Sequence, residues 1–226
     1  TNDSNSIHRI LKTDIKKEPN LHEDEIIFGC GCFWGAEKCF WKLPGVVTTS
    51  VGYAGGNKMN PTYYEVCSGL TGHSEVVRVI WNKSEIDISD LLKMFWECHD
   101  PTQKNRQGND MGTQYRSAIY YKNDNNKKII LASKKQYQNE LNKKNFGLIE
   151  TEIKMIDTYF YAEQYHQQYL ASPGSRQYCS ASPTKAKLVD FPGSNFKLEK
   201  HVWENFDWEV DKCVLRSDNN PIRNCN

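Results

Sequence analysis

The stretch FGCGCFWGAEKCFW, residues 28–41, places two cysteines one residue apart between glycines and follows them with two aromatic residues. The short apolar run at residues 25–28 ends at a glycine, which predicts a buried strand. The residues at 36–43 predict a helix that a Pro-Gly pair stops. Cys32 is therefore expected at a strand-to-helix corner, where the unpaired amides of a helix N-terminus stabilise a thiolate.

Outward from this corner, segments typical of strands and of helices are mixed along the chain. Strands are predicted at residues 46–53, 74–81, 114–121 and 151–156, and helices at 61–67, 90–99, 123–144 and 162–170. Ser89 is the expected cap of one helix. This mixture predicts an α+β fold: a two-layer α/β sandwich, in which helices pack on a mixed sheet in a ferredoxin-like arrangement, plus a long C-terminal coil.

The same patterns divide the chain into three parts. Residues 1–22 are polar and unpatterned, so we expect a tail that is mobile or lies on the surface. Residues 23–172 contain all the predicted strands and helices and form the expected domain. Residues 173–226 are rich in turns, and we expect a coil extension that wraps the domain. The polar loop at 100–113 is long enough to indicate a functional segment.

Composition excludes several classes of partner. The 226 residues contain 29 basic and 28 acidic side chains, and no basic stripe indicates nucleic acid. No apolar run approaches membrane-spanning length, so no membrane partner is expected. Because the chain begins at Thr1, a leader-processed compartment, either the secretory pathway or an organelle, is favoured over the cytoplasm.

The eight cysteines are spaced too irregularly for a disulfide framework. Cys39, Cys67 and Cys98 lie in or beside apolar runs, and we expect them to be buried as small hydrophobic residues. Cys30 is either buried or an alternative reactive thiol, because a Cys30–Cys32 disulfide would close a strained small ring.

Five sequence motifs, one at the Cys32 corner and four along the rest of the domain, occur in a fixed order. They are GCFWG at 31, GYAGG at 52, PTYYEVCSGLTGHSEVV at 61, HDPTQKNRQGNDMGTQYRSAIYY at 99 and AEQYHQQYL at 162. Together they make the chain similar to the peptide methionine sulfoxide reductase A family from about residue 26 to about residue 172. The resemblance implies an enzyme, a peptide-methionine (S)-S-oxide reductase, that repairs oxidised proteins or free methionine sulfoxide.

The resemblance also implies a role for each motif residue. Cys32 corresponds to the nucleophile, and Glu75 to the acid that protonates the sulfoxide oxygen, a task for which burial must raise the pKa of the carboxyl group. Tyr63, rather than its neighbour Tyr64, and Tyr115 correspond to the hydroxyls that hold this oxygen. The remaining matches are Asp110, which helps to organise the site, and Phe33 and Trp34, which receive the methyl group.

The family further implies a thiol cycle. A sulfenic acid on Cys32 would condense with the resolving residue Cys179 to form a disulfide. Cys213 is the candidate for a second, distal thiol, although Cys225 and Cys30 remain alternatives, and Cys213 and Cys225 could instead bridge each other. A thioredoxin-type protein, or dithiothreitol in vitro, would regenerate a monomeric enzyme that needs no metal or organic cofactor.

Two other readings remain open. CGCFW faintly resembles the context of a papain-like thiol hydrolase, with His166 far downstream as its partner. A metal-binding module could use Cys30, Cys32, His73, Cys98 or His99, although no second close pair of ligands follows.

Overall fold

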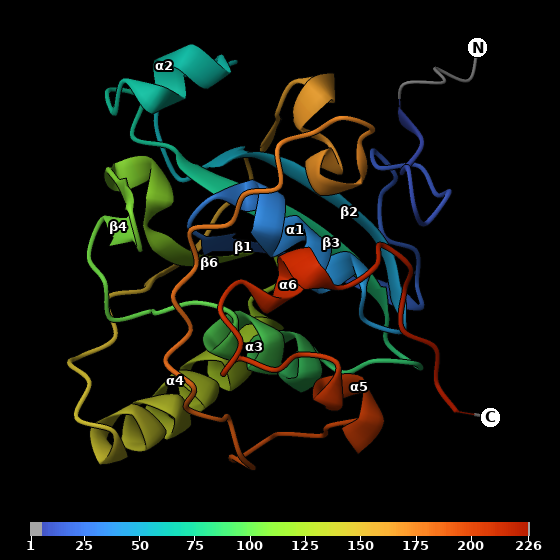
Figure 1. The fold of residues 1–226 in the computed structure, drawn as a ribbon, viewed down its shortest axis with the longest axis vertical. Helices are drawn as coiled ribbons and strands as arrows, with labels where there is room; N and C mark the ends of the chain where they lie inside the picture. The colour runs from blue at the N-terminus through green and yellow to red at the C-terminus, as the bar shows by residue number, and fades with distance from the viewer. Residues whose placement is uncertain (1–5, 226) are drawn as a thin grey trace.

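A six-stranded mixed sheet forms the centre of the protein in the computed structural model, which describes residues 6–225 (Figure 1). The strand order is β7-β6-β1-β3-β2-β8, and only the β6–β7 pair is parallel. The strands are β1 (Glu23–Cys30), β2 (Val46–Ala54), β3 (Ser74–Asn82), β6 (Ser117–Tyr121), β7 (Glu152–Met155) and β8 (Phe160–Tyr161). A separate two-stranded ribbon consists of β4 (Arg106–Gln107) and β5 (Asp110–Met111).

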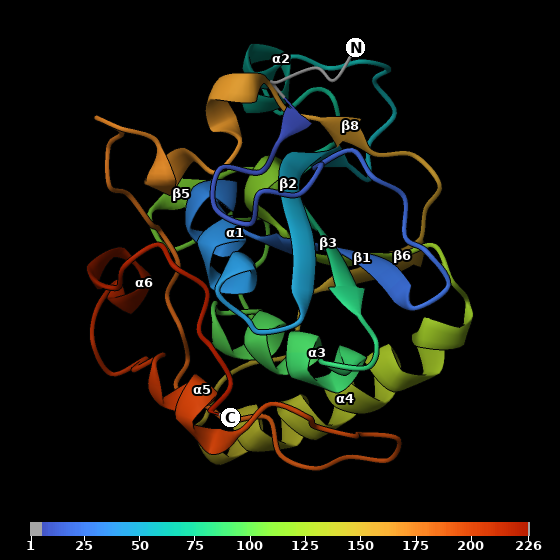
Figure 2. The ribbon, with the colours of Figure 1, turned by 90° about the vertical axis from the view of Figure 1, so that its right-hand side faces the viewer.

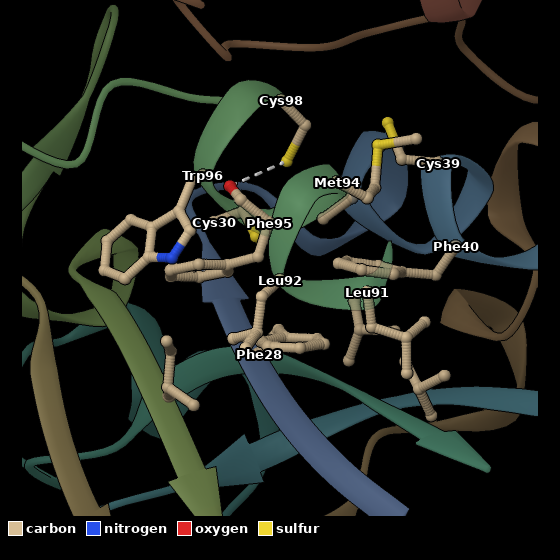
Figure 3. Close-up of a cluster of buried hydrophobic side chains, with 14 of the residues drawn as sticks. Phe28, Cys30, Cys39, Phe40, Leu91, Leu92, Met94, Phe95, Trp96 and Cys98 are labelled. Atoms are coloured by element: carbon tan, nitrogen blue, oxygen red, sulfur yellow. Dashed lines mark hydrogen bonds between the residues drawn. The ribbon is translucent and has the colours of Figure 1, made fainter. Parts of the chain in front are cut away.

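Three helices pack on one face of this sheet: α1 (Phe33–Trp41), α3 (Ile88–Glu97) and α4 (Asn125–Lys143) (Figure 2). Because side chains alternate along a strand, Phe28 points to the helices while its neighbour Ile27 joins a smaller cluster on the other face. The ring of Phe28 stacks on Phe40 at 4.8 Å and on Phe95 at 5.0 Å between centroids (Figure 3). The predicted α+β fold with helices on a mixed sheet is confirmed.

Two helix starts are fixed by reciprocal capping. In α2 (Tyr63–Cys67), the Thr62 hydroxyl accepts from the backbone of Glu65 while the Glu65 carboxylate accepts from Thr62. In α3 the cap is Asp87, whose carboxylate accepts from the Ser89 amide at 2.9 Å. The prediction of Ser89 as the cap is wrong, because the N-cap is Asp87, two residues earlier, which forms a capping box with Asp90.

The helix predicted at 162–170 is also wrong. Two short 3₁₀ turns, η3 (Gln164–His166) and η4 (Tyr169–Ala171), occupy this segment, and Gln168 between them has a φ of +47°. The Gln168 side-chain amide donates to the buried Glu37 carboxyl at 2.7 Å, and its backbone N–H donates to the other Glu37 oxygen at 2.9 Å. These tertiary hydrogen bonds stabilise the left-handed backbone conformation of Gln168, which interrupts a continuous helix.

The described part of the N-terminal segment, residues 6–22, lies against the domain rather than away from it. His8 and Ile15 are buried, and His8 Nε2 lies 2.8 Å from the Thr49 hydroxyl in β2. The backbone carbonyls of Ile15 and Lys17 accept from the guanidinium of the buried Arg78. The segment therefore lies on the surface, as one of the two expectations stated, and two of its side chains reach the interior.

The C-terminal extension wraps the helical side of the domain, as Figure 1 shows in orange and red. It contains two short helices, α5 (Lys200–Glu204) and α6 (Cys213–Arg216), in otherwise irregular chain. The ammonium groups of Lys38 and Lys42 on the α1 side donate to carbonyls of residues 217–220 and hold the extension in place. The division into tail, domain and extension stays a prediction. Among the described residues, no helix combines the length and apolar character needed to cross a bilayer.

Candidate active site

Cys32 occupies the corner between β1 and α1, as the N-cap residue of α1. Gly31 precedes it with a φ of +86°, a conformation that glycine adopts without strain. A Cβ at this position would lie 2.6 Å from the Gln107 side chain, so both backbone and packing require glycine. The turn thus presents Cys32 in a pocket at the N-terminal end of the helix.

The predicted site residues converge on this one pocket. Its lining comprises Cys32, Phe33, Trp34, Tyr63, Glu75, Asp110 and Tyr115, together with Arg176 and Tyr178. These residues come from α1, α2, β3, β5, the 3₁₀ turn η2 (Thr113–Tyr115) and the C-terminal extension. The fold therefore brings together side chains that are more than 80 residues apart along the chain, while their individual roles stay predictions.

Glu75 is a buried carboxyl group beside the helix start. It lies near the beginning of β3, and the Phe33 backbone N–H donates to its Oε1 at 3.2 Å. Burial raises the pKa of Glu75 to about 8; the charge of Asp110 adds to this shift and the Phe33 amide opposes it. Glu75 is therefore mostly a carboxylic acid at neutral pH, the form that can donate a proton.

Two phenols face the same pocket. Tyr63 is the first residue of α2, with its backbone N–H held by the Glu163 carboxylate at 2.9 Å, whereas the neighbouring Tyr64 is 80% exposed. Tyr115 ends the turn η2. Burial raises the pKa of both pocket phenols, so each keeps its proton and can donate a hydrogen bond.

Asp110 has a partner that sequence reasoning missed. The Tyr178 hydroxyl donates to Asp110 Oδ1 at 2.7 Å, and the Arg176 guanidinium lies 4.7 Å from the centre of the Tyr178 ring. Both partners belong to the segment RQYCS, in which only Cys179 was an expected site residue. The tyrosine beside this cysteine was the available signal, because an aromatic residue next to a reactive thiol can form a pocket wall.

The apolar wall is built from Phe33 and Trp34. Trp34 stacks on Tyr169 at 3.9 Å between centroids, and its indole N–H donates to His166 Nδ1 at 3.0 Å. Burial lowers the pKa of His166 to about 4, so the ring is neutral. A neutral imidazole whose Nδ1 is engaged by Trp34 positions the indole and does not provide the imidazolium that a thiol hydrolase pairs with its cysteine.

The thiol of Cys32 differs from the expectation for a helix N-terminus. Burial and the nearby charge of Glu75 raise its pKa well above the usual range, although the Trp34 backbone N–H opposes this shift. Burial outweighs the helix terminus, because it disfavours the charged thiolate form of Cys32. Cys32 is therefore a thiol in the substrate-free protein.

The other cysteines lie outside this pocket. Cys179 is buried and Cys213 is partly exposed, and both line a second cavity along α1. Cys67 is exposed, so the expectation that it would be buried is wrong: it ends the short helix α2 at the surface. Cys225 is exposed and lies beside Glu199 and His201.

Of the proposed metal ligands, Cys30, Cys98 and His99 come within 4.8 Å of one another. Both nitrogens of His99 are already engaged: Nδ1 lies 2.6 Å from the Phe95 carbonyl and Nε2 lies 2.8 Å from the Ser117 hydroxyl. Cys32 belongs to the pocket described above and not to this group. The arrangement offers thiols to a metal ion but no free imidazole.

A cysteine beside a protonated carboxyl group, two phenols and an apolar wall on this α+β fold defines a thiol-dependent oxidoreductase. The family described as peptide methionine sulfoxide reductase matches residues 24–195. A relative from Vibrio vulnificus, "Peptide methionine sulfoxide reductase MsrA", is 54% identical over 79% of this chain and 85% of its own. The chain belongs to the peptide methionine sulfoxide reductase family and, as a member, reduces methionine sulfoxide.

Solved structures agree with this assignment. Methionine sulfoxide reductase A of Corynebacterium diphtheriae is 40% identical, with a TM-score of 0.69 over 81% of this chain and 89% of its own. Mxr1 from Saccharomyces cerevisiae in reduced form is 33% identical, with a TM-score of 0.65 over 76% of this chain and 96% of its own. The family predicted from the five motifs is confirmed.

Proposed function

We propose that this protein reduces the S epimer of methionine sulfoxide, free or within proteins, through a sulfenic acid on Cys32. The observation that supports the proposal most strongly is the protonated Glu75 in the same pocket as the Cys32 thiol. The pocket lining combines polar groups that can bind oxygen (Glu75, Tyr63 and Tyr115) with the apolar rings of Phe33 and Trp34. A chiral sulfoxide can contact both kinds of group and face Cys32 in only one of its two configurations.

The chemical step transfers one oxygen atom and two electrons. The Cys32 sulfur attacks the sulfoxide sulfur while Glu75 gives its proton to the sulfoxide oxygen. The thiol proton of Cys32 then restores Glu75. Transfer of the hydroxyl group to Cys32 breaks the sulfur–oxygen bond of the substrate, so methionine leaves and Cys32 becomes a sulfenic acid. The phenols of Tyr63 and Tyr115 stabilise the negative charge that builds on the oxygen.

Recycling follows on the thiols of the extension. Cys179 attacks the Cys32 sulfenic acid, water leaves, and a Cys32–Cys179 disulfide forms. Cys213, which is partly exposed, carries the oxidising equivalent outward. Mxr1 has also been solved in complex with Trx2, and we propose that a thioredoxin-type protein regenerates this chain, with dithiothreitol as a substitute in vitro.

The proposal keeps three further predictions: the protein is a monomer, it needs no metal or organic cofactor, and it resides in a leader-processed compartment. Gel filtration with light scattering, activity after chelation, and localisation of the tagged protein in its own cells test these in turn. A loss of activity on chelation would contradict the second prediction.

The test of the main proposal is a single turnover without external reductant. The reduced enzyme is mixed with each resolved epimer of a blocked methionine sulfoxide, and methionine product and free thiols are counted. We expect the S epimer to react and the R epimer to remain. The Cys32→Ser variant should form no product, and retained turnover in this variant would refute the proposed nucleophile.

A further inference from the structure

A cavity beside α1 collects more thiols than the proposed cycle uses. Five cysteines line it: Cys30, Cys39, Cys98, Cys179 and Cys213. The other walls include Trp208, Val210 and Val214 of the C-terminal extension. Figure 3 shows that Cys30, Cys39 and Cys98 come from three different places, the end of β1, the last turn of α1 and the C-cap of α3. The proposed cycle leaves these three thiols without a role.

The position of Cys179 is fixed relative to α1 by Gly35. A Cβ built on Gly35 would lie 2.7 Å from Cys179 Sγ, so the sulfur rests directly on the backbone of the helix. Gly35 is three residues after Cys32 and four residues before Cys39. With a helical rise of about 1.5 Å per residue, Gly35, which Cys179 contacts, lies along the helix axis about 4–5 Å from Cys32 and about 6 Å from Cys39.

Cys213 lies beside the same helix. It begins α6, which packs on α1, and it lines the cavity with Cys39 and Cys179. Burial, followed by the proximity of Cys39, raises the pKa of Cys179 and of Cys213, each to about 12. Cys39, Cys179 and Cys213 therefore line one cavity beside α1.

We propose that Cys39 is a relay residue, which accepts the disulfide from Cys179 and passes it to Cys213. The inference rests on the proposed function, because it needs the Cys32–Cys179 disulfide as its starting point. It assigns a redox step to a cysteine in the last turn of α1 that the sequence patterns treat only as a core residue.

Each step of the relay exchanges one thiol for one disulfide sulfur. The Cys39 thiol loses its proton and attacks Cys179, the Cys32–Cys179 bond breaks, and Cys32 leaves as a thiolate that takes up a proton. Cys213 then attacks Cys39, so that a Cys39–Cys213 disulfide forms and Cys179 returns to the thiol. An external dithiol reduces the last disulfide, and the total oxidation level changes only in that step.

The number of methionines formed per enzyme molecule reports the relay. Transfer of the disulfide to Cys39 frees Cys32, which can then reduce a second sulfoxide. In the Cys213→Ser variant without reductant, transfer to Cys39 frees Cys32, and we expect about two methionines per enzyme: one disulfide and one sulfenic acid. In Cys39→Ala/Cys213→Ser, Cys32 stays in its disulfide, and we expect about one. Cys98→Ala/Cys213→Ser is the matched control, because Cys98 lines the same cavity from α3, and about two are expected.

The outcomes separate the two proposals. No methionine from Cys213→Ser would refute the proposed function itself, whereas a count of about one would refute the relay alone. A count of about two in Cys39→Ala/Cys213→Ser, or of about one in the Cys98 control, would assign the transfer to another thiol and overturn the proposal. Peptide mapping of the oxidised Cys213→Ser protein must show a Cys39–Cys179 disulfide. This check, together with Cys39→Ser in place of Cys39→Ala, keeps the test valid if one variant folds poorly.

Discussion

The two hollows beside α1 differ in chemistry although they share one helix. The pocket at its N-terminal end holds carboxyl groups, phenols and one thiol, whereas the cavity along its side holds five thiols and apolar walls. Oxygen transfer needs directed proton donors, and disulfide exchange needs a thiol that can reach a disulfide sulfur. One helix, α1, therefore borders both the oxygen-transfer pocket and the thiol cavity, and Cys179 lies beside this helix. The two sites keep different surroundings.

The largest effect should come from removing the acid of the polar pocket. Glu75→Gln keeps the size of the side chain but removes the proton that the sulfoxide oxygen needs. We expect the single-turnover rate to fall by roughly 100-fold or more, as for loss of a general acid. Rapid quenching with methionine detection measures this rate, and Glu150→Gln, an exposed glutamate, is the control. A near-normal rate in Glu75→Gln would remove Glu75 from the mechanism.

The next largest effect should arise in the thiol cavity from Gly35→Ala. The new Cβ would meet Cys179 Sγ at 2.7 Å, so the segment that carries Cys179 must shift. We expect formation of the Cys32–Cys179 disulfide to slow by about tenfold or more, because misplacement of a reacting group by about 1 Å has effects of this size.

Thiol loss after a single turnover reports this step separately from methionine release, which should change much less. Gly147→Ala, where nothing lies within 4 Å of the new Cβ, is the matched control. If Gly35→Ala closes the disulfide as fast as the wild type, the close contact between α1 and Cys179 does not position the resolving thiol.

The rate of the chemical step in the polar pocket should also depend on pH. Because burial raises the pKa of Glu75 to about 8, the acid is protonated below this pH and loses its proton above it. The single-turnover rate should therefore be high below pH 8 and fall above it, by about tenfold at one pH unit or more beyond the pKa. Glu75→Gln should lack this decline, and the same decline in Glu75→Gln would mean that another group causes it.

The smallest effect concerns the contact that joins the extension to the polar pocket. Tyr178→Phe removes the hydroxyl that donates to Asp110 at 2.7 Å and leaves the ring in place. A single hydrogen bond is worth about 1 kcal/mol, so kcat/KM should fall by about threefold to tenfold. Tyr64→Phe, at an 80% exposed position, is the control and should leave kcat/KM unchanged. Equal values for the two variants would show that Tyr178 does not act through Asp110.

Local sequence patterns predicted most of the fold and the polar pocket. The strands and the main helices follow from apolar periodicity and from turn residues. The seven motif residues of the pocket were expected from the resemblance of the five motifs to the family. The helix at 162–170 failed because contacts of Gln168 with Glu37 in α1 override its pattern. The cap at Ser89 failed because two aspartates compete for the same role.

The sequence by itself determined the mixed sheet and the place of Cys32 at a strand-to-helix corner, since these depend on residue types and spacing within short segments. Its five motifs also carried the resemblance to the family, and that resemblance made Glu75 a candidate. Only the tertiary structure decided that Tyr178 meets Asp110, that burial raises the pKa of Glu75, and that Cys39, Cys179 and Cys213 share one cavity. The physical reason is sequence separation. Cys39 and Cys179 are 140 residues apart, and no local pattern records where the chain returns to the same helix.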